Sequence, residues 1–159
     1  MPGIFVDTKI KTTVILLTKG EKGNNPEKRI SEFEIAMGWW GFDYKIFDFP
    51  DLELAYVPLK KMVDKVKSVV DENKITDLVS FSPFELTDGF DHPDHNMAGE
   101  VTRLVSTGML GQRGLRLWTS SGKSDLIDER LEYARRFYPS QTIPREILEK
   151  IGESYINIR

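Results

Sequence analysis

Residues 12–38 read TTVILLTKGEKGNNPEKRISEFEIAMG and contain the signals of a strand, a loop and a helix in succession. The β-branched and apolar residues 12–18 are typical of a buried strand, and residues 19–25 have the composition of a turn. Asn25 can cap a helix that has Pro26 at its first position and that ends at Gly38. The apolar residues on one face of this helix are Ile30, Phe33, Ala36 and Met37. The stretch therefore predicts a strand followed by a helix that packs on it.

The same alternation continues through the chain. The further expected strands are residues 45–49, 77–82 and 115–119, and the further expected helices are residues 58–70, 93–105, 125–138 and 144–152. Strands that alternate with helices imply βαβ crossovers and a mainly parallel sheet covered on both faces. We therefore expect a single α/β domain over residues 1–159, with the loops after the strands on one rim, where ligands bind in such sheets.

Composition excludes several classes of function. The net charge of −3 and the lack of a stripe of basic and aromatic residues argue against nucleic acid as a partner. The chain has no apolar run of the roughly 18–20 residues that a membrane span needs, and no leader pattern, so we expect a cytoplasmic protein and leave a homo-oligomer open. With zero cysteines, any metal must be held by histidine nitrogens and carboxylate oxygens.

Both histidines of the chain lie within four residues, in the sequence His92-Pro93-Asp94-His95. This sequence falls in an expected strand-to-helix loop, with Pro93 suited to a first helical turn. A helix N-terminus disfavours protonated imidazole and so favours the neutral form that binds a metal. The same residues also fit a plain helix start, in which Asp91 or His92 caps the helix and the histidines are surface residues.

Four short motifs follow one another along the chain. They are T-K-G-E at residues 18–21, R-I-S-E at residues 29–32, P-D at residues 50–51 and H-P-D-H-N-M-A-G at residues 92–99. As an ordered set they resemble the PIG-L/LmbE-like family of zinc-dependent de-N-acetylases, with the best match over residues 12–108. The resemblance implies a Rossmann-like three-layer sandwich with a mainly parallel sheet.

The resemblance also assigns roles to residues. His95 would be a ligand of Zn²⁺, and His92 would stabilise the oxyanion or protonate the leaving amine. Asp94 would assist catalysis as the carboxylate that orients a histidine. Arg29 and Asp51 would help to bind the substrate, although Arg29 also fits a solvated helix face and Asp51 a simple turn. The substrate would be an N-acetylated amino sugar, a glycoconjugate or a related acetamide, cleaved to acetate and an amine.

One expected part of the family pattern is missing. Members begin with a strand that ends in an A-H-P-D-D-E-like motif and supplies two further metal ligands and a base, and residues 1–11 do not match it. That strand would be central, between the strands at residues 12–18 and 78–82, so its absence would require a rearrangement or another polypeptide. Truncation, a split gene and true loss are the explanations left open. The chain is then either a hydrolase, whose activity in this form stays open because half of the metal site is missing, or a catalytically dead relative that acts as a binding module. An unrelated small binding domain ranks last.

Overall fold

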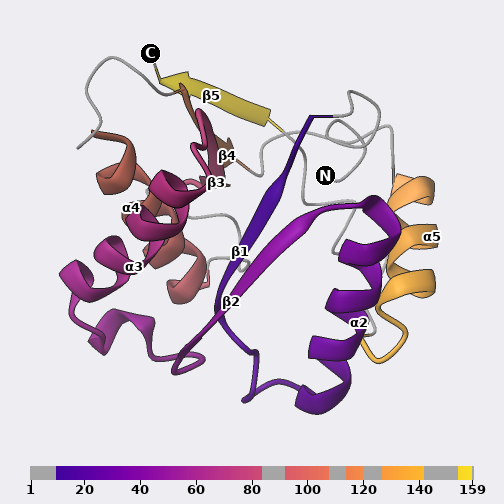
Figure 1. Ribbon diagram of the computed structural model, residues 1–159. Helices are drawn as coiled ribbons and strands as arrows, with labels where there is room; N and C mark the ends of the chain where they lie inside the picture. Colours follow the sequence, from indigo (N-terminus) through magenta and orange to yellow (C-terminus); the bar gives the residue numbers. More distant parts are fainter. Residues whose placement is uncertain (1–9, 84–91, 108–113, 120–126, 142–153, 159) are drawn as a thin grey trace. The chain divides into compact units, whose positions relative to one another are not determined.

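The computed structural model describes residues 10–83, 92–107, 114–119, 127–141 and 154–158 (Figure 1). In chain order the elements are β1 (Thr13–Thr18), α2 (Pro26–Trp40), β2 (Asp43–Phe49), the 3₁₀ helix η1 (Leu54–Tyr56), α3 (Leu59–Glu72), β3 (Asp77–Phe81), α4 (Pro93–Thr107), β4 (Gly114–Thr119), α5 (Ile127–Phe137) and β5 (Ser154–Ile158). The chain divides into two compact units, Met1–Asp51 with Asp128–Ile143 and Leu52–Ile127 with Pro144–Arg159. Each unit is described by itself.

The first unit is a parallel pair of strands covered by helices. β1 pairs with β2 in parallel, with Thr13 opposite Asp43 and Leu16 opposite Ile46. Helix α2 packs on this pair, and α5 packs along α2 (Figure 1). The centre of the core consists of Phe33, Ala36, Met37 and Phe137, with Val14, Leu16, Trp40, Phe42, Ile46, Tyr133 and Tyr138 packed around them. The strand and the helix expected from residues 12–38 are therefore confirmed.

The end of α2 differs from the sequence prediction. The helix continues through Gly38 and ends at Gly41, which has a φ of 67° and donates its backbone N–H to the carbonyl of Gly38. A glycine inside a helix costs only about 1 kcal/mol, so packing of Trp40 on the core can outweigh it. Asn25 occupies the N-cap position, but its φ is 52° and its side chain makes no capping hydrogen bond. Gly38 was therefore wrong as the helix end, and Asn25 was wrong as a side-chain cap.

The second unit contains a three-stranded mixed sheet. β3 pairs with β4 in parallel, and β4 pairs with β5 antiparallel. Helix α4 packs against β3, α3 and η1. The fully buried side chains of this unit include Leu54, Met62, Val70, Val101 and Val105. The α/β fold with parallel strand pairs is confirmed, whereas β5 had not been predicted and the expected helix at residues 144–152 lies outside the described residues.

β1 and β3 belong to separate sheets. The described strands form one sheet of order β1-β2 and another of order β3-β4-β5, so no ladder joins β1 to β3 among them. The direct pairing of these two neighbours, one of the rearrangements considered from the sequence, is therefore absent from the described residues. The single domain over residues 1–159 stays a prediction.

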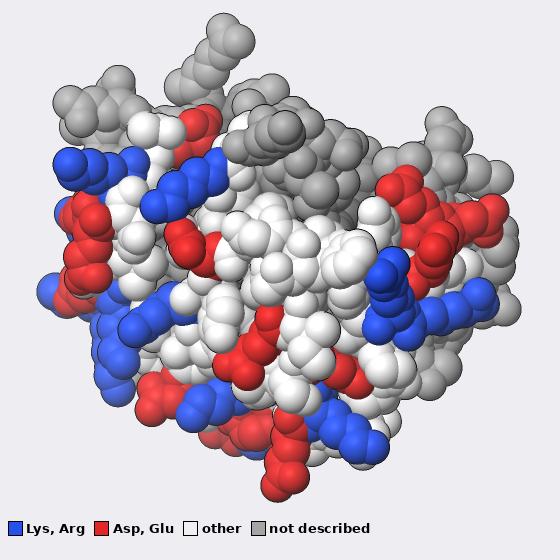
Figure 2. Space-filling model, turned by 45° about the vertical axis from the view of Figure 1, so that its right-hand side comes forward, with Lys and Arg blue, Asp and Glu red and all other residues white. Residues whose placement is uncertain are grey.

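Charged side chains of both signs are interspersed on the face shown in Figure 2, among the residues that the structure describes. On α3, the pairs Lys60–Asp64 and Lys67–Asp71 are ion pairs between residues one helical turn apart. Within the described ranges, none of the helices has the length and apolar character needed to cross a membrane. The exclusion of nucleic acid as a partner stays a prediction.

Candidate active site

His92 caps helix α4 with its side chain. The backbone N–H of Asp94 donates to Nδ1 of His92, with 3.2 Å between the two nitrogens. An N–H group can donate only to a ring nitrogen that carries no proton, so the proton of the neutral ring is on Nε2. His92 can therefore cap the helix and also have a chemical role. Capping uses one ring nitrogen and leaves the Nε2–H donor for a ligand.

The two histidines lie side by side. The ring centroids of His92 and His95 are 4.8 Å apart, and the ring of His95 stacks on Phe81 at the end of β3, with 4.1 Å between centroids and 5° between planes. Gly99 permits this close approach, because a Cβ at its position would lie 2.4 Å from the carbonyl oxygen of Phe81. The structure therefore brings His92 and His95 together and explains the glycine of the H-P-D-H-x-x-x-G motif.

Asp94 is buried, with 7% of its surface exposed, and its carboxylate binds the segment that follows β2. Oδ2 accepts the backbone N–H of Leu52 at 2.7 Å, and Oδ1 accepts that of Leu54 at 3.2 Å. Both carboxylate oxygens therefore face backbone N–H groups, and the expected role of Asp94 in orienting a histidine stays a prediction.

Asp51 connects the loops that follow the two strands of the first unit. Its carboxylate accepts the hydroxyl of Thr18 at 3.2 Å and the backbone N–H of Lys22 at 3.1 Å. Its own backbone N–H donates to the carboxylate of Glu21 at 2.7 Å. Asp51 is therefore more than a simple exposed turn residue, since it holds the Thr18–Lys22 loop in place. Glu21, to which the sequence had assigned no role, completes this interaction.

Arg29 binds the same loop from helix α2. Its guanidinium donates to the carbonyl of Gly20 at 3.4 Å and to the side-chain oxygen of Gln141 at 3.1 Å. Gly23 makes room for it, because a Cβ there would lie 2.0 Å from Nη1 of Arg29. The guanidinium is therefore half-buried in a glycine-lined loop and is not on a solvated helix face. Whether Arg29 or Asp51 contacts a substrate stays a prediction.

Glu32, the last residue of the R-x-x-E motif, was assigned no role from the sequence. Its carboxylate is buried and accepts both the backbone N–H and the hydroxyl of Ser140, at 2.8 and 2.7 Å. Burial raises the pKa of the neighbouring Tyr138, and the negative charge of Glu32 raises it further. The R-x-x-E motif thus fixes the turn that follows α5. The signal in the sequence was an acidic residue on the buried face of α2, one residue before Phe33.

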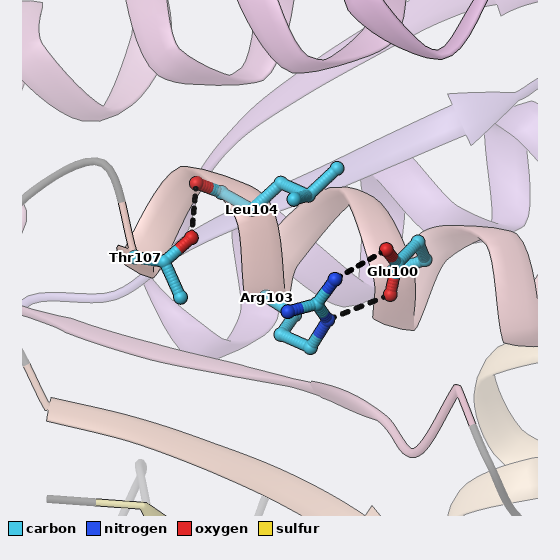
Figure 3. A network of polar contacts seen from close by, with 4 residues as sticks. All are labelled: Glu100, Arg103, Leu104 and Thr107. Carbon is cyan, nitrogen blue, oxygen red and sulfur yellow. Dashed lines mark hydrogen bonds and ion pairs between the residues drawn. The ribbon is translucent and has the colours of Figure 1, made fainter.

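Helix α4, which carries the histidines, has a two-pronged ion pair on its partly exposed side (Figure 3). Arg103 donates from Nε and Nη2 to the two carboxylate oxygens of Glu100, at 2.7 and 2.6 Å. The hydrogen bond from Arg103 lowers the pKa of Glu100 below its ordinary value of 4.5. The pair links successive turns of the helix behind the histidine-bearing end.

The zinc ion implied by the family resemblance needs three protein ligands at a catalytic site. Within residues 10–83, 92–107 and the shorter described segments, no three His, Asp or Glu side chains are grouped so that they could hold a metal ion. His95 provides one candidate ligand, while the carboxylate oxygens of Asp94 face backbone N–H groups. Asp88 and Asp91, two further carboxylates close to the histidines in the sequence, lie outside the described residues. The described residues therefore do not complete the site, and we derive no catalytic step through a metal.

Comparison with known families decides the assignment. The sequence profile of the PIG-L family, described as GlcNAc-PI de-N-acetylase, matches residues 4–106, more than half of the chain. The chain belongs to the PIG-L family. The match includes all four motifs quoted from the sequence, and family membership supports a hydrolase function of the de-N-acetylase type. No curated protein matches the chain significantly.

Two solved structures share the fold. One is N,N'-diacetylchitobiose deacetylase from Pyrococcus horikoshii, complexed with its inhibitor MPG, with a TM-score of 0.72, 14% identity, and coverage of 98% of this chain and 75% of that chain. The other is the conserved protein TT1542 from Thermus thermophilus, with a TM-score of 0.69, 22% identity, and coverage of 93% and 76%. At these identities the two structures confirm the fold, and about a quarter of each neighbour has no counterpart in this chain.

Proposed function

We propose that this PIG-L family chain is a hydrolase that removes the acetyl group from an N-acetylated amino sugar, a glycoconjugate or a related acetamide. The observation that carries the proposal is the capping bond of His92, whose Nδ1 accepts the N–H of Asp94. This bond fixes the orientation of the ring and keeps its proton on Nε2. An oriented donor at a helix N-terminus, beside a second imidazole, suits the hydrolysis of an amide.

The chemistry of the reaction explains why such a donor matters. When water adds to the acetyl carbon, the carbonyl oxygen gains negative charge, and the amine takes up a proton as the C–N bond breaks. The Nε2–H of His92 can donate a hydrogen bond to the charged oxygen. A neutral imidazole does not give up this proton, so the proton for the leaving nitrogen must come from another group. We propose zinc as the metal and the cytoplasm as the location, with His95 as one metal ligand and the remaining ligands supplied from outside the described residues.

The proposal is tested with the full chain incubated with N-acetylglucosamine and with N,N'-diacetylchitobiose, in the presence of zinc. Acetate and free amine are measured together, because hydrolysis must release them in equal amounts. We expect His92→Ala to lower the rate at least about a hundredfold, the usual contribution of a positioned donor to the oxyanion. Lys28→Ala, at an exposed position on α2, serves as the control and should leave the rate unchanged.

Metal analysis separates the two functions considered from the sequence. One equivalent of zinc, lost in His95→Ala, would support the hydrolase. If the chain bound the sugar but neither bound zinc nor released acetate, the hydrolase function would be overturned and a catalytically dead binding module would be supported. In that case His92→Ala and His95→Ala should leave sugar binding intact. The absence of both binding and acetate release would overturn the assignment to acetylated sugars altogether.

A further inference from the structure

The segment that follows β2 exposes two large apolar side chains at the start of helix α4. Leu52 has 52% and Tyr56 86% of its surface exposed, whereas Leu54 between them is 1% exposed and packs in the core. A single exposed apolar side chain is common on protein surfaces, whereas apolar side chains exposed on one short segment can mark a ligand-binding surface.

Asp94 ties this segment to the histidines. Its carboxylate accepts the backbone N–H groups of Leu52 and Leu54, and it lies between His92 and His95 in the first turn of α4. Leu52 adopts a φ of 61°, which is unusual for a leucine and is maintained here by the 2.7 Å hydrogen bond to Asp94. The strained conformation fixes the backbone from which the side chain of Leu52 projects.

The side chains exposed here suit a sugar. Binding sites for small molecules combine apolar and aromatic walls with a few polar groups that fix orientation. A pyranose ring has an apolar C–H face that stacks on an aromatic ring, and an acetyl methyl group needs an apolar neighbour. Tyr56 adds a hydroxyl that can hydrogen-bond to the polar edge of the sugar.

We propose that Leu52 and Tyr56 form the apolar wall of the substrate site and determine its specificity for N-acetylated sugars, and that Asp94 is the positioning residue that holds this wall beside His92. This inference rests on the proposed function, and it adds two substrate-contacting residues that lie outside the motifs quoted from the sequence.

Binding of N-acetylglucosamine to the full chain, measured by ligand-observed NMR titration, tests the wall. We expect Tyr56→Ala and Leu52→Ala each to weaken binding about threefold to tenfold, and Tyr56→Phe to retain most of it, because the ring supplies the stacking surface. Ile35→Ala is the matched control, since Ile35 is also a large apolar side chain, 64% exposed, but lies on α2. Where acetate is released, the losses should appear in KM and leave kcat nearly unchanged.

Asp94→Asn tests the positioning role, because asparagine keeps one acceptor oxygen but replaces the other with an amide nitrogen, which cannot accept an N–H. One of the hydrogen bonds from Leu52 and Leu54 is therefore lost. We expect faster amide exchange at one of these two residues together with weaker sugar binding, and no further loss when the substitution is added to Leu52→Ala/Tyr56→Ala. An additional loss in that background would overturn the positioning role. If Leu52→Ala and Tyr56→Ala bound the sugar as well as the unsubstituted chain does, the proposed role of these two residues would be overturned and the proposed function would stand. If the unsubstituted chain did not bind the sugar, both the role of these residues and the assignment to acetylated sugars would be overturned.

Discussion

The imidazole of His95 lies flat on the phenyl ring of Phe81, with 4.1 Å between the ring centroids. This stacking requires helix α4 to approach the end of β3 closely, and Gly99 lies where the two meet. A Cβ at Gly99 would be 2.4 Å from the carbonyl oxygen of Phe81 and 2.8 Å from the backbone nitrogen of Pro83. We therefore predict that Gly99→Ala lowers the free energy of unfolding by about 1–3 kcal/mol, as overpacking against backbone does, measured by urea denaturation.

Gly38→Ala provides the matched control for this prediction. Gly38 also lies inside a helix, but a Cβ there would meet no atom within 4 Å. Alanine should therefore stabilise the chain by about 0.5–1 kcal/mol through helix propensity alone. If Gly99→Ala were stabilising to the same extent, α4 could move away from β3 at no cost, and the account of the glycine in the motif would be wrong.

The carboxylate of Glu32 carries the second prediction. It accepts two hydrogen bonds from Ser140, one of them from the backbone, so Glu32→Ala leaves a backbone N–H without its partner. We expect a loss of about 1–3 kcal/mol in the free energy of unfolding and faster amide exchange at Ser140. Ser140→Ala removes only the hydroxyl bond and should cost less. Equal costs for the two variants would show that the backbone bond contributes nothing.

The extent to which the fold could be predicted depended on periodicity. The apolar repeat of α3 and the β-branched run of β1 identified their elements correctly. The repeat of α3 matches its buried face, whereas all residues of β1 are only partly buried. The end of α2 could not be placed from the sequence, because Gly38 and Gly41 are equally plausible stops and only the structure shows that Trp40 packs on the core. β5 was missed because a short C-terminal strand pairing antiparallel with β4 has no local signal that separates it from a loop.

The proximity of the two histidines could be predicted from the sequence, whereas the contacts of the other candidate site residues could not. His92 and His95 are close in sequence on a helix start, so their proximity follows from local geometry. Asp94 illustrates the limit, because its hydrogen bonds reach Leu52 and Leu54 about forty positions earlier in the chain. Glu32 and Ser140 are farther apart still. Such tertiary contacts depend on how elements pack, and no spacing within one sequence reveals them.

The ion pair of Glu100 and Arg103 leads to a prediction on pH. Arg103 lowers the pKa of Glu100 in the folded chain below the ordinary 4.5, so folding favours the ionised carboxylate. The stabilisation is therefore present above pH 4.5 and is lost as the pH falls through the lowered folded pKa. Glu100→Gln should be less stable than the unsubstituted chain at pH 7, by at most about 1 kcal/mol for a partly exposed pair, and the two should converge in acid. Urea denaturation at pH 7 and in acid measures the difference in the free energy of unfolding between the two chains. If this difference did not shrink in acid, the stabilisation could not come from the ionised carboxylate of Glu100.

Arg29 and Gly23 should be energetically coupled. A Cβ on Gly23 would overlap the guanidinium of Arg29, so Gly23→Ala must displace that group from Gly20 and Gln141. We predict that Gly23→Ala destabilises the chain, and that most of this cost disappears in the Arg29→Ala background, where the guanidinium is gone. The coupling energy from a double-mutant cycle in urea should be about 0.5–3 kcal/mol, the range for residues in contact. If the destabilisation by the two substitutions were strictly additive, the glycine at position 23 would be needed for the backbone conformation of the loop and not to make room for Arg29.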